Sequence, residues 1–181
     1  MSLRRWWMLL LVLGLVACGQ KPSDAKADWP LVWLYPGDSC QNTRTQVLVA
    51  ERANLIQWAD PMSCTLAGGT WQSWGKDVQL GLGQAMVVPL VTPENAVKSG
   101  ASDWTREQQI AFINDKQNLI ILDPVSVGER KALGPDRWIP IERFRCEYGQ
   151  RWQDVKQRYH LRMTSDEKQA VAALLKTCPS H

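Results

Sequence analysis

The chain has 181 residues, with 21 Lys and Arg against 18 Asp and Glu and a formal net charge of +3. This length supports one domain with its own hydrophobic core. Two of the basic residues, Arg4 and Arg5, lie in a leader segment, so the rest of the chain carries only 19 basic residues against 18 acidic ones. A nearly neutral chain argues against avid binding of nucleic acid, which requires many phosphate contacts.

Residues 1–17 are typical of a secretory signal. Arg4 and Arg5 precede the apolar run Trp6–Val16, which is too short to span a bilayer as a stop-transfer helix. The run ends at a small-residue cleavage site before Cys18, and this Leu-Val-Ala-Cys sequence resembles the signal of bacterial lipoproteins.

The lipoprotein resemblance implies lipidation of Cys18 and a tether and N-terminal arm over residues 18–36. It also implies an outer-membrane lipoprotein of the bacterial cell envelope, facing the periplasm or the cell surface, because Gly19 rather than Asp follows the cysteine. An ordinary signal peptide with an incidental cysteine is the alternative interpretation.

Four cysteines remain after Cys18, and an even number in an exported chain predicts disulfides. Three pairings are possible. We favour Cys40–Cys64 and Cys146–Cys178, because each joins neighbouring elements. A zinc site is disfavoured by the absence of a C-x-x-C spacing and by the oxidising compartment.

The first half of the chain alternates helix and strand signals. Residues Trp29–Tyr35 form either a first strand or a docked arm, and Asn42 or Thr43 caps a helix that runs to about Ala53. Gly68 and Gly69 then predict a hairpin between Met62–Leu66 and Thr70–Trp74. The glycine-rich segment Lys76–Gln84 is expected to be a loop.

The second half begins with a predicted strand at Met86–Leu90 and continues with helical patterns. We expect a short helix from Thr92 to about Ser99, a helix over Trp104–Asn114 capped by Asp103, and a buried strand at Leu119–Leu122. A polar loop or the start of a helix follows over Val127–Gly134. Two further helices are predicted at residues 141–159 and after Thr164, which forms a capping box with Glu167.

Seven motifs in this order resemble the secreted HNH-endonuclease-like family, which is related to the C-terminal domain of GmrSD-type restriction enzymes. They are C-Q-N-T-R-T-Q-V-L from Cys40, C-T-L-A-G-G-T-W from Cys64, V-V-P-L from Val87, S-G-A-S-D-W from Ser99, F-I-N-D-K-Q-N-L from Phe112, G-P-D-R-W-I-P from Gly134 and C-E-Y-G-Q-R-W-Q-D-V-K-Q-R-Y from Cys146. The resemblance implies an α+β fold over residues 37–181, with a ββα-metal (HNH-like) core, an N-terminal helix and hairpin, and two C-terminal helices.

The residues that the family uses for catalysis are replaced here. Its Asp-His pair, which binds a divalent metal and activates water, falls on Ala85 and Met86, and its third site residue falls near Gly128, three positions before Lys131. Only the family's loop-fixing Asn is retained, as Asn118. We therefore predict no catalytic residue, metal ligand or cofactor, and we expect Met86 to be an apolar core residue.

We expect a lipid-anchored envelope protein that keeps the nuclease scaffold as a non-catalytic binding protein. One alternative is an active HNH-type endonuclease with a displaced Mg²⁺ or Zn²⁺ site, with candidate residues Asp115, Asn118, Asp123, Glu129 and Lys131. The ordinary interpretation places Asp115 at a helix end and Asp123 in a turn. The two histidines, His160 and His181, do not fit beside Met86 in this topology.

Another alternative is a decoy or immunity-like interaction protein. Predicted partners are the membrane, through the lipid anchor, and either nucleic acid or an envelope protein. Contacts with nucleic acid would fall on a basic C-terminal third, whose candidate residues are Arg143, Arg145, Arg151, Lys156 and Arg158.

Overall fold

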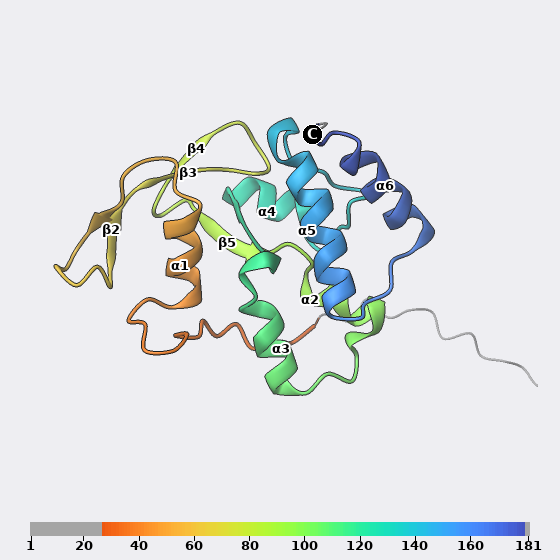
Figure 1. The fold of residues 1–181 in the computed structure, drawn as a ribbon, viewed down its shortest axis with the longest axis horizontal. Coiled ribbons are helices and arrows are strands. Elements are labelled where there is room, and N and C mark those ends of the chain that lie inside the picture. Colours follow the sequence, from red (N-terminus) through yellow and green to blue (C-terminus); the bar gives the residue numbers. More distant parts are fainter. Residues whose placement is uncertain (1–26, 180–181) are drawn as a thin grey trace, which may run out of the picture.

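The computed structural model describes residues 27–179. Within this part of the chain, six α-helices and three two-stranded antiparallel sheets form a mixed fold, so the predicted α+β class is confirmed (Figure 1). The predicted signal segment and Cys18 lie outside the described residues. None of the helices from residue 27 onward is both long and apolar enough to cross a bilayer.

Strands β5 (Met86–Pro89) and β6 (Leu119–Leu122) form the central pair, with Met86 opposite Leu122 and Pro89 opposite Leu119. Both strands were predicted close to these bounds. All four residues of β6 are buried, and alternate side chains enter different cores because successive residues of a strand point to opposite faces.

Helix α4 (Pro124–Arg130) follows β6 directly. Asp123 caps it by accepting a hydrogen bond from the Ser126 backbone N–H at 2.9 Å, and Pro124 occupies the first turn, where its missing N–H costs no hydrogen bond. In the segment Val127–Gly134, which we expected to be a loop or the start of a helix, the first four residues therefore form the second half of α4, and the last four follow the helix as a turn and irregular chain.

The connection between β5 and β6 contains α2 (Pro93–Ala96), the π-helical turn η1 (Val97–Ala101), α3 (Arg106–Ile113) and the 3-10 turn η2 (Lys116–Asn118). Thr105, rather than the predicted Asp103, caps α3. The reason is local: Thr105 and Gln108 form a reciprocal capping box, which satisfies two backbone N–H groups at once.

The N-terminal half contains α1 (Thr43–Ala50), capped by Asn42, and four short strands. These strands are β1 (Gln57–Trp58), β2 (Leu66–Gly68), β3 (Thr70–Gln72) and β4 (Gln79–Gly81). The predicted hairpin across Gly68 and Gly69 is wrong, because β2 pairs with β1 and β3 pairs with β4. Gly69 instead adopts a φ of 153° where the Trp71 and Ile56 side chains approach its backbone, so the two glycines separate two sheets.

The C-terminal half contains the 3-10 turn η3 (Glu142–Phe144), α5 (Arg145–Arg158) and α6 (Ser165–Leu175), and the last two helices lie side by side (Figure 1). The predicted capping box of Thr164 and Glu167 is present. Both predicted disulfides, Cys40–Cys64 and Cys146–Cys178, are also present, with Cα–Cα distances of 5.3 and 4.8 Å.

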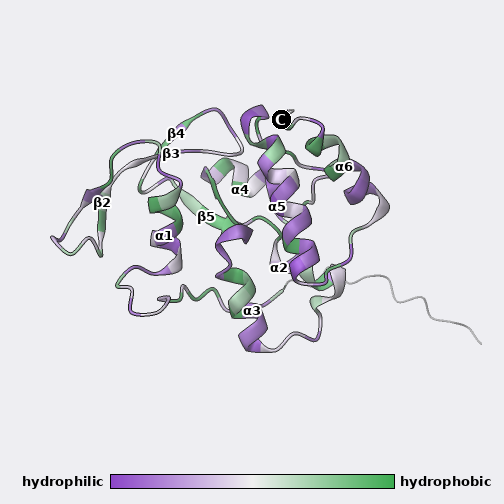
Figure 2. Ribbon diagram, viewed as in Figure 1, coloured by the Kyte–Doolittle hydropathy of each residue, from purple (hydrophilic) through white to green (hydrophobic). Residues whose placement is uncertain are grey.

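The core has two parts, which meet at β6. The larger contains Trp74, Phe112, Tyr148 and Trp152 and lies under α5 and α6. The smaller contains Leu48, Trp71 and Ile121 and lies beneath α1. In Figure 2 the hydrophobic colour is clear on β5, and α1 and α3 each carry both hydrophobic and hydrophilic stretches.

Candidate functional site

The start of β5 carries the positions that match the family's Asp-His pair. Ala85 is buried, at 2% exposure, within the smaller core, whereas Met86 is 40% exposed. The prediction that Met86 belongs to the core is therefore wrong. Val87 takes the inward-facing position, so the pleat of the strand turns Met86 to the other side.

Met86 lines a cavity of ≈ 660 Å³ that lies between the N-terminal arm, β5 and the end of α4. Most of its wall is apolar. The arm contributes Trp29, Leu31 and Trp33, and β5 contributes Met86, Val87, Val88 and Pro89.

Asn114, at the C-terminal end of α3, holds the arm over this cavity. Its side-chain oxygen accepts a hydrogen bond from the Leu34 N–H at 2.8 Å, and its amide nitrogen donates to the Val32 carbonyl at 2.8 Å. Trp29 also packs against Trp104, with 5.5 Å between ring centroids. The segment Trp29–Tyr35 is thus a docked arm rather than a strand, and the arm, orange in Figure 1, runs past α3 toward α1.

Asn118 is fully buried and braces the connection between β5 and β6. Its side-chain oxygen accepts a hydrogen bond from the Val91 N–H at 2.8 Å, and its amide nitrogen donates to the carbonyls of Val91 and Phe112, both at 3.3 Å. Both amide hydrogens therefore have backbone partners. The side chain fixes the loop, which is the role that the family resemblance implies.

Gly128 and Lys131 lie at the end of α4. A Cβ added at Gly128 would meet nothing within 4 Å, and Lys131 is exposed, with a positive φ of 46° at the helix end. Lys131 lines the cavity, and so does Arg130, which is only 3% exposed. Sequence reasoning missed Arg130 and Val127, which α4 places one turn apart on the wall of the cavity; the Asp-Pro start of the helix is the signal that could have revealed them.

The acidic residues of the alternative metal site are dispersed. Asp115 precedes η2 and Asp123 follows β6, so the four residues of β6, which span about 13 Å, lie between them in the chain. Asp115 accepts a hydrogen bond from Arg158 at 2.6 Å, and the exposed Glu129 pairs with Lys76 at 3.3 Å. Across residues 27–179, no three His, Cys, Asp or Glu side chains are grouped closely enough to hold a metal ion.

The Asp123 carboxylate is part of a small buried network. It accepts hydrogen bonds from the Ser126 hydroxyl at 2.6 Å and the Ser73 hydroxyl at 2.8 Å. Burial by itself raises the pKa of Asp123, but the hydrogen bonds from Ser126 and Ser73 outweigh burial and hold that pKa below its usual value. The geometry is that of a helix cap, so Asp123 has a structural role at the start of α4 rather than the position in a turn that the ordinary interpretation gave it.

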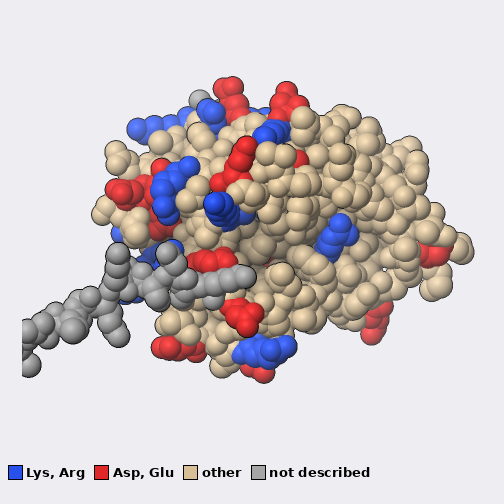
Figure 3. All heavy atoms as spheres, turned by 180° about the vertical axis from the view of Figure 1, so that it is seen from behind, with Lys and Arg blue, Asp and Glu red and all other residues tan. Residues whose placement is uncertain are grey.

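Each of the five basic residues proposed to contact nucleic acid has a partner within the protein. Arg143 pairs with Asp77 and Arg158 with Asp115, both at 2.6 Å, and Arg145 donates to the Pro140 carbonyl. The side chains of Arg151 and Lys156 are buried. On the face shown in Figure 3, Lys and Arg also intermingle with Asp and Glu instead of forming one basic patch. Nucleic-acid binding stays a prediction.

Of the two histidines, the structure describes one. His160 is an exposed residue with a φ of 52° just after α5. His181 lies outside the described residues.

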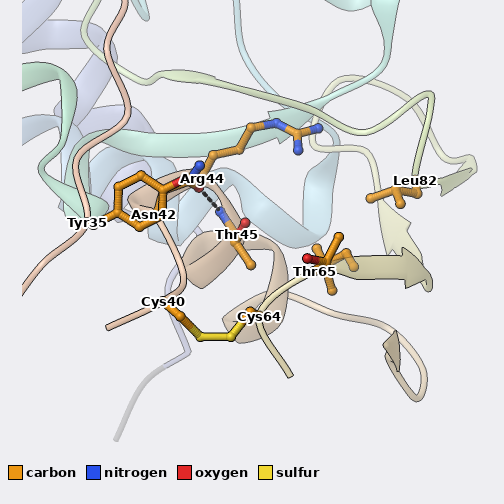
Figure 4. A pocket seen from close by; sticks show the side chains of 9 residues that line it. Tyr35, Cys40, Asn42, Arg44, Thr45, Cys64, Thr65 and Leu82 are labelled. Atoms are coloured by element: carbon orange, nitrogen blue, oxygen red, sulfur yellow. Dashed lines mark hydrogen bonds between the residues drawn. A yellow bond between two sulfur atoms is a disulfide. The ribbon is translucent and has the colours of Figure 1, made fainter. Parts of the chain in front are cut away.

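A smaller cavity of ≈ 300 Å³ lies beside the Cys40–Cys64 disulfide at the start of α1 (Figure 4). Its wall is mainly polar, and the figure shows the Asn42 side chain bonded to the Thr45 backbone. Arg44 extends from this wall and donates to the Ala85 carbonyl at 3.3 Å. The contact links α1 to the start of β5.

Comparison with known proteins shows that the chain belongs to the same family as a fungal secreted protein. A protein of Arthroderma benhamiae (strain ATCC MYA-4681 / CBS 112371), named "Uncharacterized secreted protein", is 34% identical over 182 residues, which cover 93% of this chain and 83% of the relative. No family model and no solved structure matches the chain. The resemblance to HNH endonucleases therefore stays a prediction.

This relative corrects the predicted localisation. A secreted protein of a fungus points to extracellular secretion, so the prediction of an outer-membrane lipoprotein of the bacterial cell envelope is wrong. The error has a simple origin. A basic start, a short apolar run and small residues before the cleavage site are common to secretory signals in general, and one cysteine after that site does not define a lipoprotein.

Proposed function

We propose that this protein is a secreted, non-catalytic binding protein built on an HNH-nuclease-like scaffold. Secretion of the fungal relative and two disulfides support an oxidising extracellular setting. The antiparallel strands β5 and β6, followed directly by α4, have the strand–strand–helix order that a ββα core requires.

One observation carries the proposal: Met86, the position that matches the catalytic His of the family, lines a mainly apolar cavity. Hydrolysis of a phosphodiester requires an activated water and a cation that stabilises the developing negative charge. The Ala85 side chain has no ligating atom, and the Met86 thioether is a soft ligand that suits copper(I) rather than Mg²⁺ or Zn²⁺. The wall that Met86 shares includes the apolar side chains of Val87, Val88 and the N-terminal arm.

The test is incubation of the purified secreted protein with plasmid DNA in Mg²⁺, Mn²⁺ or Zn²⁺. We expect no cleavage above that of matched variants at two exposed positions, Glu129→Gln and Lys131→Gln, neither of which should disturb folding. Cleavage by the unchanged protein that either substitution abolishes would contradict the proposal and support the displaced metal site. Equal cleavage in all three proteins would identify a contaminating nuclease, which repurification removes before the comparison is repeated.

A further inference from the structure

Arg130 forms part of the cavity wall and is a buried cation with no carboxylate in direct contact among the described residues. Burial lowers the pKa of Arg130, and the Glu94 carboxylate on the same wall, which acts on it only through space, raises that pKa less strongly. The Arg130 guanidinium donates to the Leu90 carbonyl and lies 5.6 Å from the centroid of the Trp138 ring. Among the described residues, no carboxylate oxygen lies within 4.0 Å of it, although seven other ion pairs form. Burying an unpaired charge is costly, so this position favours an anion.

The neighbouring Tyr148 does not supply that anion. Burial raises the pKa of the Tyr148 phenol to about 12, so this side chain is neutral at physiological pH. The Arg130 guanidinium lies close enough to Tyr148 to lower the pKa of its phenol, against the larger effect of burial. The Arg130 Nε atom and the Tyr148 hydroxyl are nevertheless both buried, and neither makes a hydrogen bond of normal geometry within residues 27–179. Part of the hydrogen-bonding capacity of the guanidinium is therefore unused.

The rest of the cavity suits an apolar chain. Leu31 is 76% exposed and Met86 is 40% exposed, and both lie on its wall together with Trp29, Trp33 and Val88. The volume of ≈ 660 Å³ lies within the range of roughly 300–1,000 Å³ that is typical of small-molecule sites. An apolar wall with one charged group is the usual composition of such a site.

The charges on the wall also limit the type of anion. Asp28 and Lys131 are exposed and Glu94 is half-buried, whereas Arg130 is the most deeply buried charge of the cavity. The two carboxylates on the wall disfavour a doubly charged group such as a phosphate monoester. A single carboxylate satisfies Arg130 with the least repulsion.

We propose that this cavity binds a single-chain carboxylate, with its carboxylate at Arg130 and its hydrocarbon chain between β5 and the N-terminal arm. The proposal rests on the proposed function, because it gives the ligand class of the same binding site. A carboxylate there forms charge-assisted hydrogen bonds with the guanidinium, and the chain covers exposed apolar side chains of the arm.

The experiment is calorimetric titration of the full secreted protein with decanoate, with 1-decanol as the neutral ligand of equal chain length. We expect decanoate to bind at least about tenfold more tightly than 1-decanol, which is the usual effect of a hydrogen bond to a charged group. Arg130→Met should remove this preference and leave 1-decanol affinity unchanged. Equal affinities of the two ligands for the unchanged protein, or no binding of either, would overturn the proposal.

Met86→Glu is the second variant, because an exposed position tolerates substitution even if Arg130→Met does not fold. It places a negative charge beside the chain of the ligand and should weaken decanoate binding by about tenfold or more. Met62→Glu is its matched control, since Met62 is 79% exposed and does not line the cavity. Equal decanoate affinity in both variants would contradict the proposed location.

The two proposals fail separately. If decanoate does not bind and DNA is not cleaved, the proposed ligand class is wrong and the proposed non-catalytic scaffold stands. DNA cleavage that depends on Glu129 or Lys131 removes the proposed function instead, whatever the outcome of the titration.

Discussion

Helices α4 and α5 both bury cationic side chains, but only those on α5 have carboxylate partners among the described residues. On α5, Arg151 pairs with Glu51 at 3.2 Å and with Glu147 at 3.1 Å, and it also donates to three backbone carbonyls near β6. Lys156, one turn further along, lies 3.4 Å from Glu167 and donates to Asn95 and Ser99. Each of these two cations therefore has a carboxylate partner within the protein, although burial still holds the pKa of Lys156 below its usual value.

Arg130 on α4 has one carbonyl partner and no carboxylate partner among the described residues. Both helices belong to the same fold, so burial alone does not explain the difference. The distinguishing feature is the cavity, which lies beside α4 and not beside Arg151 or Lys156. The comparison indicates that α5 is built for stability, whereas the end of α4 is available for a ligand.

The largest expected effect comes from replacing each arginine by methionine. Arg151→Met leaves the half-buried Glu51 without its partner and three backbone carbonyls without their donor, so it should lower the free energy of unfolding by about 3–5 kcal/mol. Arg130→Met removes an unpaired charge and should change that free energy by less than about 1 kcal/mol. Urea denaturation of both variants measures the difference. Equal losses of unfolding free energy in the two variants would contradict the contrast between α4 and α5.

The disulfide Cys146–Cys178 tests whether α5 and α6 form the more stable region. The bridge closes a loop with a sequence separation of 32 residues, and its removal in Cys146→Ser/Cys178→Ser should cost about 3–4 kcal/mol through the entropy of the unfolded chain. Amide hydrogen exchange should show the loss of protection first in α5 and α6. If protection from exchange is lost first in β5 and β6, the weaker contacts lie in that strand pair instead.

The smallest effect concerns the capped start of α4 in acid. Because the pKa of Asp123 is below its usual value in the folded protein, its carboxylate contributes stability above about pH 4 and loses it as the pH falls through the folded pKa. Asp123→Asn should cost about 1–2 kcal/mol at neutral pH and little at about pH 2. Urea midpoints measured from neutral pH downward test this, and a difference that stays constant would show that the charge does not matter.

Local sequence patterns predicted the elements whose causes are local. The strand Leu119–Leu122, the helix cap at Asn42 and the capping box of Thr164 and Glu167 depend on residues within a few positions of one another. Where two caps were possible, the pattern was less decisive. Asp103 is a suitable N-cap residue, but Thr105 caps α3 because it also forms a capping box with Gln108. Pairing of distant strands was not predictable in this way, since the Gly68-Gly69 turn signal does not say which neighbour each strand will find.

The candidate site was only half predictable. The resemblance located Ala85, Met86 and Asn118 in the chain, and the bracing role of Asn118 agrees with what it implied. The exposure of Met86 was missed because its cover is the arm, more than fifty residues earlier, and the arm leaves a cavity above it.

By itself, the sequence determined the α+β class, the two disulfides and the absence of the family's Asp-His pair at Ala85 and Met86. Tertiary structure alone decided that Arg130 is buried without a carboxylate while Arg151 and Lys156 have theirs. The physical reason is that caps and strand alternation depend on neighbouring residues, whereas the compensation of a buried charge depends on which distant segments fold against it.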